Sequence, residues 1–432
     1  MTSAQSEQLT LTRSYPQKTA TRAYPQKTLI SGGKLVLSDR VVENRDLIIE
    51  DGRIAAIVPA GSFGGAEFRV VDAAGCYVAP GFVDIHSDYI ETVASPRPSV
   101  VMDLRTALYG VDRSLAMHGV TTIYHSLSIY GRSLFDHKPI RQFENVLKMI
   151  RIIDQMRETE AFDHLIRHRL HLRLELDAVD YFERVSALLE GGKLDLLSFM
   201  DHTPGQGQYR DLALYAETLR GYRDDLTDAE IARIVAEQQS ADKLTLAQIE
   251  ALVALARLRG VSVASHDDDT FETLEFIWQR GATISEFPIS LEVARSAREL
   301  GMHTIAGASN VLLGYSHSGN LSARESVAAG VTSILCSDYY PAAMLKAVFV
   351  LNEICGISLP EAFALVTLNP ARAVGIDDEL GEIAEGKRAD LLLIRKVAED
   401  EHGMAIPMVE EVFVQGQSVV RASYPELGGP HE

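Results

Sequence analysis

Imidazole and carboxylate side chains recur at one kind of position in this sequence, directly after a short run of apolar residues. In chain order they are His86, Asp88, Glu175, Asp201, His202, His266, Asp267, Asp268, Glu286, His317 and Asp338. Ring nitrogens and carboxylate oxygens are donors that bind zinc, manganese, iron or nickel. One such histidine is more often structural than a ligand, but so many at equivalent positions are hard to reach by chance. The pattern therefore predicts a site for divalent metal ions.

The apolar runs that precede these side chains alternate with longer helical stretches. We predict strands at 82–86, 121–127, 170–175, 195–201, 261–265, 282–286, 303–308 and 332–338. Strand-then-helix units repeated in this number are typical of a closed parallel (β/α)8 barrel. In such a barrel the functional side chains project from the carboxyl ends of the strands. The predicted fold would therefore bring the scattered donors to one face.

Short β-rich runs flank the barrel on both sides. Those between 28 and 58 are separated by turn signals such as Asp51-Gly52, and β character returns at 391–394 and 409–420. The predicted class is α/β, a TIM-like barrel with a small discontinuous β-sandwich domain built from both chain ends. We predict a leader at 1–27, the β-domain at 28–77 and 371–432, and the barrel at 78–370.

The composition excludes several classes of function. The 432 residues include 60 acidic and 41 basic ones, a net charge of −19, which disfavours nucleic acid and anionic membranes as partners. No apolar run is long enough to span a membrane. The motifs of dinucleotide and P-loop phosphate binding and of serine hydrolases are missing. The cysteines Cys76, Cys336 and Cys355 form no C-x-x-C pair, which favours a cytoplasmic protein without disulfides.

Residues 78–88, with the sequence VAPGFVDIHSD, resemble the opening signature of the amidohydrolase superfamily, and 367–375 with 386–392 resemble its closing signature. Within it the chain is similar to the branch that serves the carbon–phosphorus lyase pathway of phosphonate metabolism. DHTPGQ at 201–206 and SHSGN at 316–320 carry this likeness, whereas Tyr89 stands where that branch has asparagine. The resemblance implies two divalent ions, zinc first and manganese, iron or nickel as alternatives. It also implies release of pyrophosphate from α-D-ribose 1-methylphosphonate 5-triphosphate.

Roles for individual residues follow as a hypothesis. The ions would be held by His86, Asp88, Glu175, His202, His266 and Asp338. Glu175 would bridge them, and Asp338 would be the general base for the attacking water. Contacts to the anionic substrate would come from Arg97, His125, Arg173, His317 and Asn320, with Arg105, Lys138 and Arg210 as further cations. Arg97, between two prolines, is the first choice for a phosphate contact.

Two other functions fit the same residues. The metal site could hydrolyse an amide, a cyclic amide or an amidine of a small molecule, since these reactions also use an activated water. Alternatively, the barrel could have lost catalysis and bind a ligand only, although the complete donor set speaks against this. We expect a small phosphorylated substrate as the partner, and a homodimer, the state common in this family.

Overall fold

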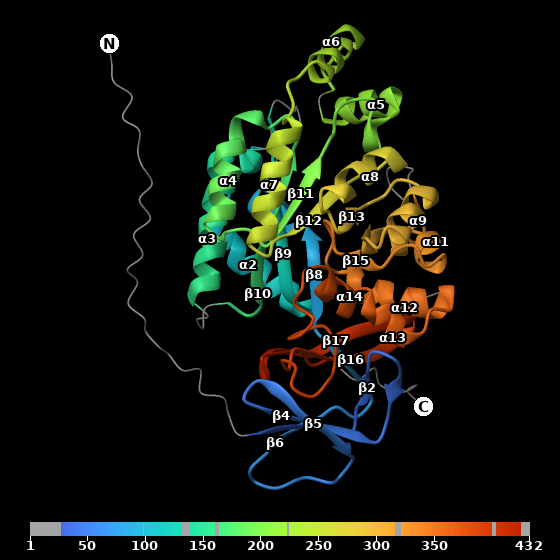
Figure 1. The fold of residues 1–432 in the computed structure, drawn as a ribbon. Helices are drawn as coiled ribbons and strands as arrows, with labels where there is room; N and C mark the ends of the chain where they lie inside the picture. The colour runs from blue at the N-terminus through green and yellow to red at the C-terminus, as the bar shows by residue number, and fades with distance from the viewer. Residues whose placement is uncertain are drawn as a thin grey trace.

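The computed structural model describes residues 27–97, 99–131, 139–159, 164–222, 224–315, 321–399 and 403–424. One sheet of eight parallel strands curls into a barrel with helices around it, and two further sheets lie beyond one end (Figure 1). The carboxyl ends of the barrel strands point away from these two sheets (Figure 1). In the described residues, no helix combines the length and the apolar character needed to cross a membrane.

Each barrel strand pairs in parallel with the next along the chain, and each overlaps one of the predicted strands. The strands are β8 (Phe82–Ser87), β9 (Val120–Ile129), β10 (Arg167–Glu175), β11 (Leu196–Met200), β12 (Ser262–His266), β13 (Ile284–Glu286), β14 (His303–Gly307) and β15 (Ile334–Cys336). The predicted barrel is therefore confirmed.

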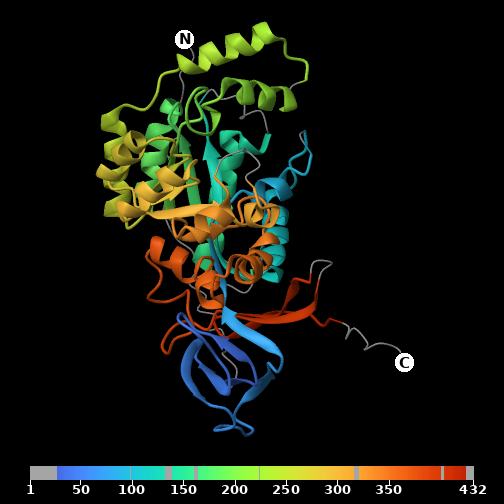
Figure 2. The same cartoon turned by 90° about the vertical axis from the view of Figure 1, so that its right-hand side faces the viewer.

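Helices follow every barrel strand. They are α1 (Tyr89–Ala94) and α2 (Leu104–Met117) after β8, α3 (Phe143–Thr159) after β9, and α4 (Phe182–Glu190) after β10. Next come α5 (Leu212–Tyr222), α6 (Asp228–Gln239) and α7 (Leu246–Leu258) after β11, α8 (Phe271–Gln279) after β12, and α9 (Leu291–Glu299) after β13. The last are α10 (Ala308–Leu313) and α11 (Ala323–Ala328) after β14, and α12 (Ala343–Cys355), α13 (Leu359–Ala364) and α14 (Leu368–Ala373) after β15. Figure 2 shows α5 and α6 at the end of the barrel opposite the two other sheets.

The alternation of side chains along each strand separates two cores. Outward residues such as Ile123 and Leu172 pack with the helices in the largest core. Inward residues such as Val83, Tyr124 and Ile305 form a small apolar core inside the barrel. This inner core supports the polar side chains at the carboxyl ends of the strands.

The β-domain consists of two sheets. The four-stranded sheet has the order β5-β4-β1-β6 and contains β1 (Thr28–Ser31), β4 (Arg45–Glu50), β5 (Arg53–Pro59) and β6 (Arg69–Asp72). The six-stranded sheet has the order β18-β17-β16-β7-β2-β3 and contains β2 (Lys34–Val36), β3 (Val41–Val42), β7 (Cys76–Pro80), β16 (Leu391–Glu399), β17 (Ala405–Val414) and β18 (Gln417–Arg421).

The two sheets share one core, in which Leu47 and Ile54 of the first meet Leu391 and Phe413 of the second. Strands from both chain ends thus build one domain, as predicted. Strand β7 runs across the boundary that we predicted at residue 78, because its residues up to Pro80 pair with β16.

The barrel closes where its first and last strands meet. The backbone N–H of Asp338 donates to the carbonyl of His86 (3.1 Å), and that of Asp88 donates to the carbonyl of Asp338 (2.7 Å). Deeper in the barrel, the Asp84 carboxylate accepts the backbone N–H of Ser337 (3.1 Å). These contacts form a seam between β8 and β15.

Candidate metal centre

The polar side chains of the centre come from inward-facing positions at the carboxyl ends of the strands. On β10, His171, Arg173 and Glu175 alternate with the outward residues Leu172 and Leu174, which lie in the outer core. A strand places every second side chain on one face, so these three polar residues point inward at successive depths. The alternation along β10 therefore buries these polar side chains inside the barrel.

One group of possible ligand atoms lies on His86, His266 and Glu286, where one atom of each falls within 4.8 Å of the others. The imidazole rings of His86 and His266 are 5.5 Å apart between centroids. Nδ1 of His86 lies 2.9 Å from Oε1 of Glu286. Glu286 ends β13, and its side chain is fully buried.

A second group lies on His202, His266 and Asp267, again within 4.8 Å. Oδ2 of Asp267 lies 2.9 Å from Nδ1 of His266 and 3.6 Å from Nε2 of His202. Among the described residues, neither Nδ1 of His266 nor Oδ2 of Asp267 has a hydrogen-bond partner, although both atoms are buried. Buried polar atoms are normally hydrogen-bonded, so these two atoms, which lie 2.9 Å apart without hydrogen-bond geometry, are available to a further ligand.

Burial sets the charge of the two central histidines. It lowers the pKa of His86 to about 3 and also lowers the pKa of His266. Both rings are therefore neutral near pH 7, the form in which a ring nitrogen can bind a metal ion. For Asp267, burial raises the pKa, but His266 and His202 lower it more, and the carboxylate stays ionised.

Glu175 and His202 form a buried pair at the ends of β10 and β11. Oε2 of Glu175 lies 2.7 Å from Nδ1 of His202, and Oε1 accepts the backbone N–H of His202 at 2.5 Å. Burial lowers the pKa of His202, but Glu175 raises it more, so its pKa lies well above the usual value. The pair holds a proton that a metal ion bound to these residues would have to release.

Arg173 places a positive charge in the middle of the predicted ligands. Its guanidinium donates to both carboxylate oxygens of Asp88 (2.9 and 3.0 Å) and lies 3.0 Å from Nε2 of His266. Burial raises the pKa of Asp88, but Arg173 outweighs it and brings the pKa to about 2. Two of the predicted metal ligands, Asp88 and His266, thus already bind the positively charged guanidinium of Arg173.

Asp338 completes the ring of strand ends. It lies just after β15 with φ at 56°, a left-handed conformation that turns the chain sharply at the seam. Burial, followed by the negative charge of Asp88, raises the pKa of Asp338 to about 7. Of the six predicted metal ligands, His86, His202 and His266 belong to the two groups of possible ligand atoms. Glu175, Asp88 and Asp338 border these groups, through His202, Arg173 and the seam respectively.

The predicted substrate contacts are placed differently. Arg173 joins the cluster, whereas Arg97 is exposed and forms an isolated backbone bridge with Val100. His125 does not reach the centre, because it occupies an outward position of β9 and its Nε2 lies 2.8 Å from Nδ1 of His168. His317, Asn320 and Lys138 lie outside the described residues.

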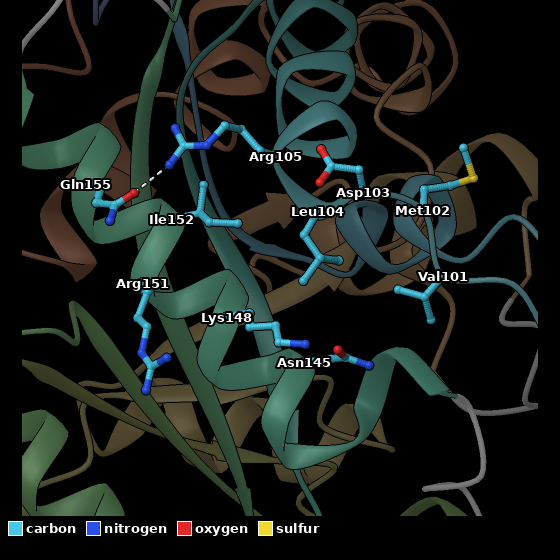
Figure 3. A pocket seen from close by; sticks show the side chains of 10 residues that line it. All are labelled: Val101, Met102, Asp103, Leu104, Arg105, Asn145, Lys148, Arg151, Ile152 and Gln155. Carbon is cyan, nitrogen blue, oxygen red and sulfur yellow. Dashed lines mark hydrogen bonds between the residues drawn. The ribbon is translucent and has the colours of Figure 1, made fainter.

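Arg105 also lies elsewhere. It lines a cavity of about 440 Å³ between the start of α2 and one face of α3, where it donates to Gln155 at 2.5 Å (Figure 3). No predicted metal ligand lines this cavity. Arg210 is exposed and follows Tyr209, whose ring lies 5.9 Å from that of His202. Arg210 therefore belongs to the segment next to the cluster.

Several residues of the centre were not in our predicted ligand set. Glu286 and Asp267 carried the strand-end signal, whereas His171 lies four residues before the end of β10 and did not. Arg141 gave no signal in the sequence. Its side chain is mostly buried and pairs with Glu91 of α1 at 2.9 Å, and its charge also lowers the pKa of Asp88.

Two strand-end aspartates are occupied by other partners. Asp201 forms an ion pair with Lys243 at 2.7 Å. The buried carboxylate of Asp268 accepts the hydroxyls of Ser265 (2.6 Å) and Ser285 (2.5 Å). Both carboxylates thus stabilise the loops that surround the centre.

The remaining residues fit a divalent metal ion. They offer imidazole nitrogens and carboxylate oxygens without sulfur, a donor set that suits zinc, manganese, iron or nickel. His266 belongs to both groups of ligand atoms, and its unpartnered Nδ1 lies beside the unpartnered oxygen of Asp267.

Comparison with known proteins identifies the family of this chain. Residues 77–419 match the model of the amidohydrolase family. Over 398 residues the chain is 34% identical to the α-D-ribose 1-methylphosphonate 5-triphosphate diphosphatase of Escherichia coli strain K12, covering 90% of this chain and 100% of that enzyme. It is 23% identical over 441 residues to an imidazolonepropionase of Symbiobacterium thermophilum, covering 90% and 93%.

Solved structures share the fold at low identity. An N-acetylglucosamine-6-phosphate deacetylase from Pasteurella multocida superposes with a TM-score of 0.59 at 12% identity, covering 91% of this chain and 99% of that chain. A Xaa-Pro dipeptidase superposes with a TM-score of 0.61 at 15% identity, covering 92% and 100%.

Proposed function

The chain belongs to the amidohydrolase family of metal-dependent hydrolases, and on this premise we propose that it releases pyrophosphate from α-D-ribose 1-methylphosphonate 5-triphosphate. The observation that carries the proposal is the end-to-end similarity to the Escherichia coli diphosphatase, which this chain matches over 100% of its length. The buried cations beside the cluster support an anionic substrate.

The residues that would hold two metal ions are the strand-end donors His86, Asp88, Glu175, His202, His266 and Asp338. When bound, divalent ions at such donors supply Lewis acidity and lower the pKa of a water molecule toward neutrality. Asp338 would accept the proton of the attacking water, because its buried carboxylate lies at the seam beside Asp88. The surrounding barrel keeps these side chains away from bulk solvent.

Recognition of a triphosphate requires positive charge, which this acidic chain must concentrate locally. Arg173 and Arg141 supply it, since both guanidinium groups are largely buried next to Asp88. A guanidinium can donate two parallel hydrogen bonds to a phosphate. We propose Arg173 for this contact in place of Arg97, the first choice from the sequence, because Arg97 is exposed.

A second candidate function is hydrolysis of an amide, cyclic amide or amidine of a small molecule. The similarity to an imidazolonepropionase over most of both chains favours it. The same metal ligands would serve both reactions, so the substrate pocket rather than the centre decides between them.

Activity measurements on the metal-loaded enzyme separate the two candidates. We expect pyrophosphate release from the ribosyl triphosphate with kcat/KM orders of magnitude above hydrolysis of any member of a panel of N-acyl compounds, cyclic imides and amidines. Efficient hydrolysis of a panel member without pyrophosphate release would instead establish the second candidate.

The assignment of Asp338 has its own test. We expect Asp338→Asn to lower kcat by about 10²- to 10⁴-fold, the usual contribution of a general base, while most metal stays bound. Asp195→Asn is the matched control, because Asp195 lies beside the amino end of β11 and accepts the backbone N–H of Leu170 (2.8 Å). Steady-state kinetics and elemental analysis measure both. Full activity of Asp338→Asn would remove Asp338 from catalysis.

A further inference from the structure

A continuous chain of hydrogen bonds runs through the barrel interior beneath the metal centre. It begins at the backbone N–H of Ser87, which donates to Oγ of Ser126 at 3.0 Å. Oγ of Ser126 lies 3.1 Å from Nδ1 of His171, and Nε2 of His171 lies 2.5 Å from Oγ of Ser198. Ser198 donates to Oε2 of Glu286 at 2.8 Å, and Oε1 of Glu286 lies 2.9 Å from Nδ1 of His86. The chain thus starts and ends on neighbouring residues of β8.

The carboxylate of Glu286 sets the direction of the chain. Because it only accepts, Ser198 donates its single hydroxyl hydrogen to Glu286 and accepts the hydrogen on Nε2 of His171. Nδ1 of His171 then accepts the hydroxyl hydrogen of Ser126, which in turn accepts the backbone N–H of Ser87. Each hydrogen bond in the chain therefore has one defined donor and one defined acceptor.

The last bond fixes the tautomer of His86. A carboxylate only accepts hydrogen bonds, so Nδ1 of His86 carries the hydrogen that Oε1 of Glu286 accepts. Nε2 of His86 is then the nitrogen with the lone pair. A carboxylate on the second nitrogen is the usual way in which proteins orient a metal-binding histidine.

We propose that Glu286 and His171 are positioning residues for the metal centre. Glu286 holds His86 in the tautomer that presents Nε2 as a ligand, and His171, acting through Ser198, fixes which oxygen of Glu286 is available to His86. This inference rests on the proposed role of His86 as a ligand, but not on the identity of the substrate.

Burial protects the chain of hydrogen bonds from competing water molecules. The side chains of His171, Ser198 and Glu286 have no exposed surface, so bulk solvent is kept from these links. Both nitrogens of His171 are engaged in the chain, so His171 itself is not available as a ligand. Its role must therefore be exerted through its hydrogen bonds.

The direction of the chain predicts the effect of Glu286→Gln. Among the described residues, Nδ1 of His171 is the only acceptor in hydrogen-bond contact with the buried Ser126 hydroxyl, so His171 keeps its hydrogen on Nε2 and donates it to Ser198. Ser198 must then donate to the amide oxygen of the new side chain. The amide NH₂ group would then face His86 and drive the hydrogen from Nδ1 to Nε2. Losing the hydrogen-bond partner of a metal-binding histidine usually lowers metal affinity by about 10- to 100-fold. We expect the affinity for Zn²⁺ to fall by more than this, because the tautomer of His86 also changes.

The tautomer of His86 provides the decisive measurement. We expect the ¹⁵N chemical shifts of His86 in the metal-free protein to show the Nε2–H form in Glu286→Gln. Single His171→Phe should keep the Nδ1–H form, because the carboxylate of Glu286 is still present, but should bind Zn²⁺ about 10-fold more weakly.

His168→Phe is the matched control, because His168 is buried on the opposite face of the same strand. It should leave the tautomer of His86 and the affinity for Zn²⁺ unchanged. An unchanged His86 tautomer in Glu286→Gln, or equal losses of affinity in the His168 and His171 variants, would overturn the proposal. Neither readout uses the substrate, so pyrophosphate release remains a separate test of the proposed function.

Discussion

Two buried hydrogen-bonded groups, each containing histidine, lie on the same two strands, β9 and β10, but on opposite faces. The inward group contains His171, which contacts Ser126 and leads through Ser198 to the metal centre. The outward group is a line of three side chains in which His168 lies between His125 (2.8 Å) and Asp112 of α2 (3.0 Å). The rings of His125 and His168 are stacked with 12° between their planes.

The two groups differ in how they end. The outward line ends on Asp112, whose carboxylate also accepts the backbone N–H groups of Leu165 (2.9 Å) and Ile166 (3.1 Å). It therefore ties helix α2 to the start of β10. The inward group leads to the cluster in which Nδ1 of His266 and Oδ2 of Asp267 lack partners among the described residues. Burial of a histidine thus does not identify a functional site, whereas the face of the strand on which it lies does.

The largest contrast is expected from removing one ring on each side. Loss of an outer hydrogen-bond partner usually lowers metal affinity by about 10- to 100-fold. His266→Asn removes a proposed ligand itself, so we expect a larger loss of metal affinity and the loss of nearly all activity. His168→Asn should keep its metal and its kcat but lower the melting temperature. Elemental analysis after dialysis, calorimetry and kinetics measure the pair. Loss of metal from both variants would erase the distinction between the two faces.

Asp112→Asn tests the structural role of the outward group. An amide oxygen cannot accept all three donors that converge on the carboxylate, so we expect a loss of about 2–3 kcal/mol in the free energy of unfolding, with kcat unchanged. Asp103→Asn, at the exposed N-cap of the same helix, should change stability little, because asparagine also caps helices. A fall in kcat measured on folded Asp112→Asn would connect the outward group to the site.

The smallest effect concerns pH. Burial, followed by the charge of His168, lowers the pKa of His125 well below 6.5. Below pH 6.5 the unfolded chain binds a proton at this residue that the folded chain does not, so stability falls as pH falls. His125→Gln should reduce this dependence by up to about 1.4 kcal/mol per pH unit. Unfolding free energies between pH 7 and pH 5 measure the slope, and an unchanged slope would contradict the burial of a neutral ring.

Much of this architecture could be predicted because its signals are local. Every barrel strand was predicted from a short apolar run, and the cluster was predicted because one element type places its end residues on one face. The same rule, applied to strand parity, would also have separated His171 from His168, since His171 is two and four residues from the inward Arg173 and Glu175.

The remaining part of the centre depends on contacts between loops. Arg141 enters from the segment before α3 and meets Glu91 in the segment after β8, a distance of 50 residues in sequence with no periodicity to reveal it. The interaction of Arg173 with Asp88 likewise joins two strand ends that are not neighbours in the sheet. His125 was misplaced because it lies five residues into a ten-residue strand, where parity rather than position decides its surroundings.

The seam between β8 and β15 has a consequence for the order in which the protein becomes active. His86 and Asp338 are joined there, although 250 or so residues of synthesis separate them. A nascent chain that has left the ribosome only as far as β14 already contains most of the donors, yet lacks the strand that closes the ring. Hydrolytic competence should therefore arise late and abruptly, when the final strand docks.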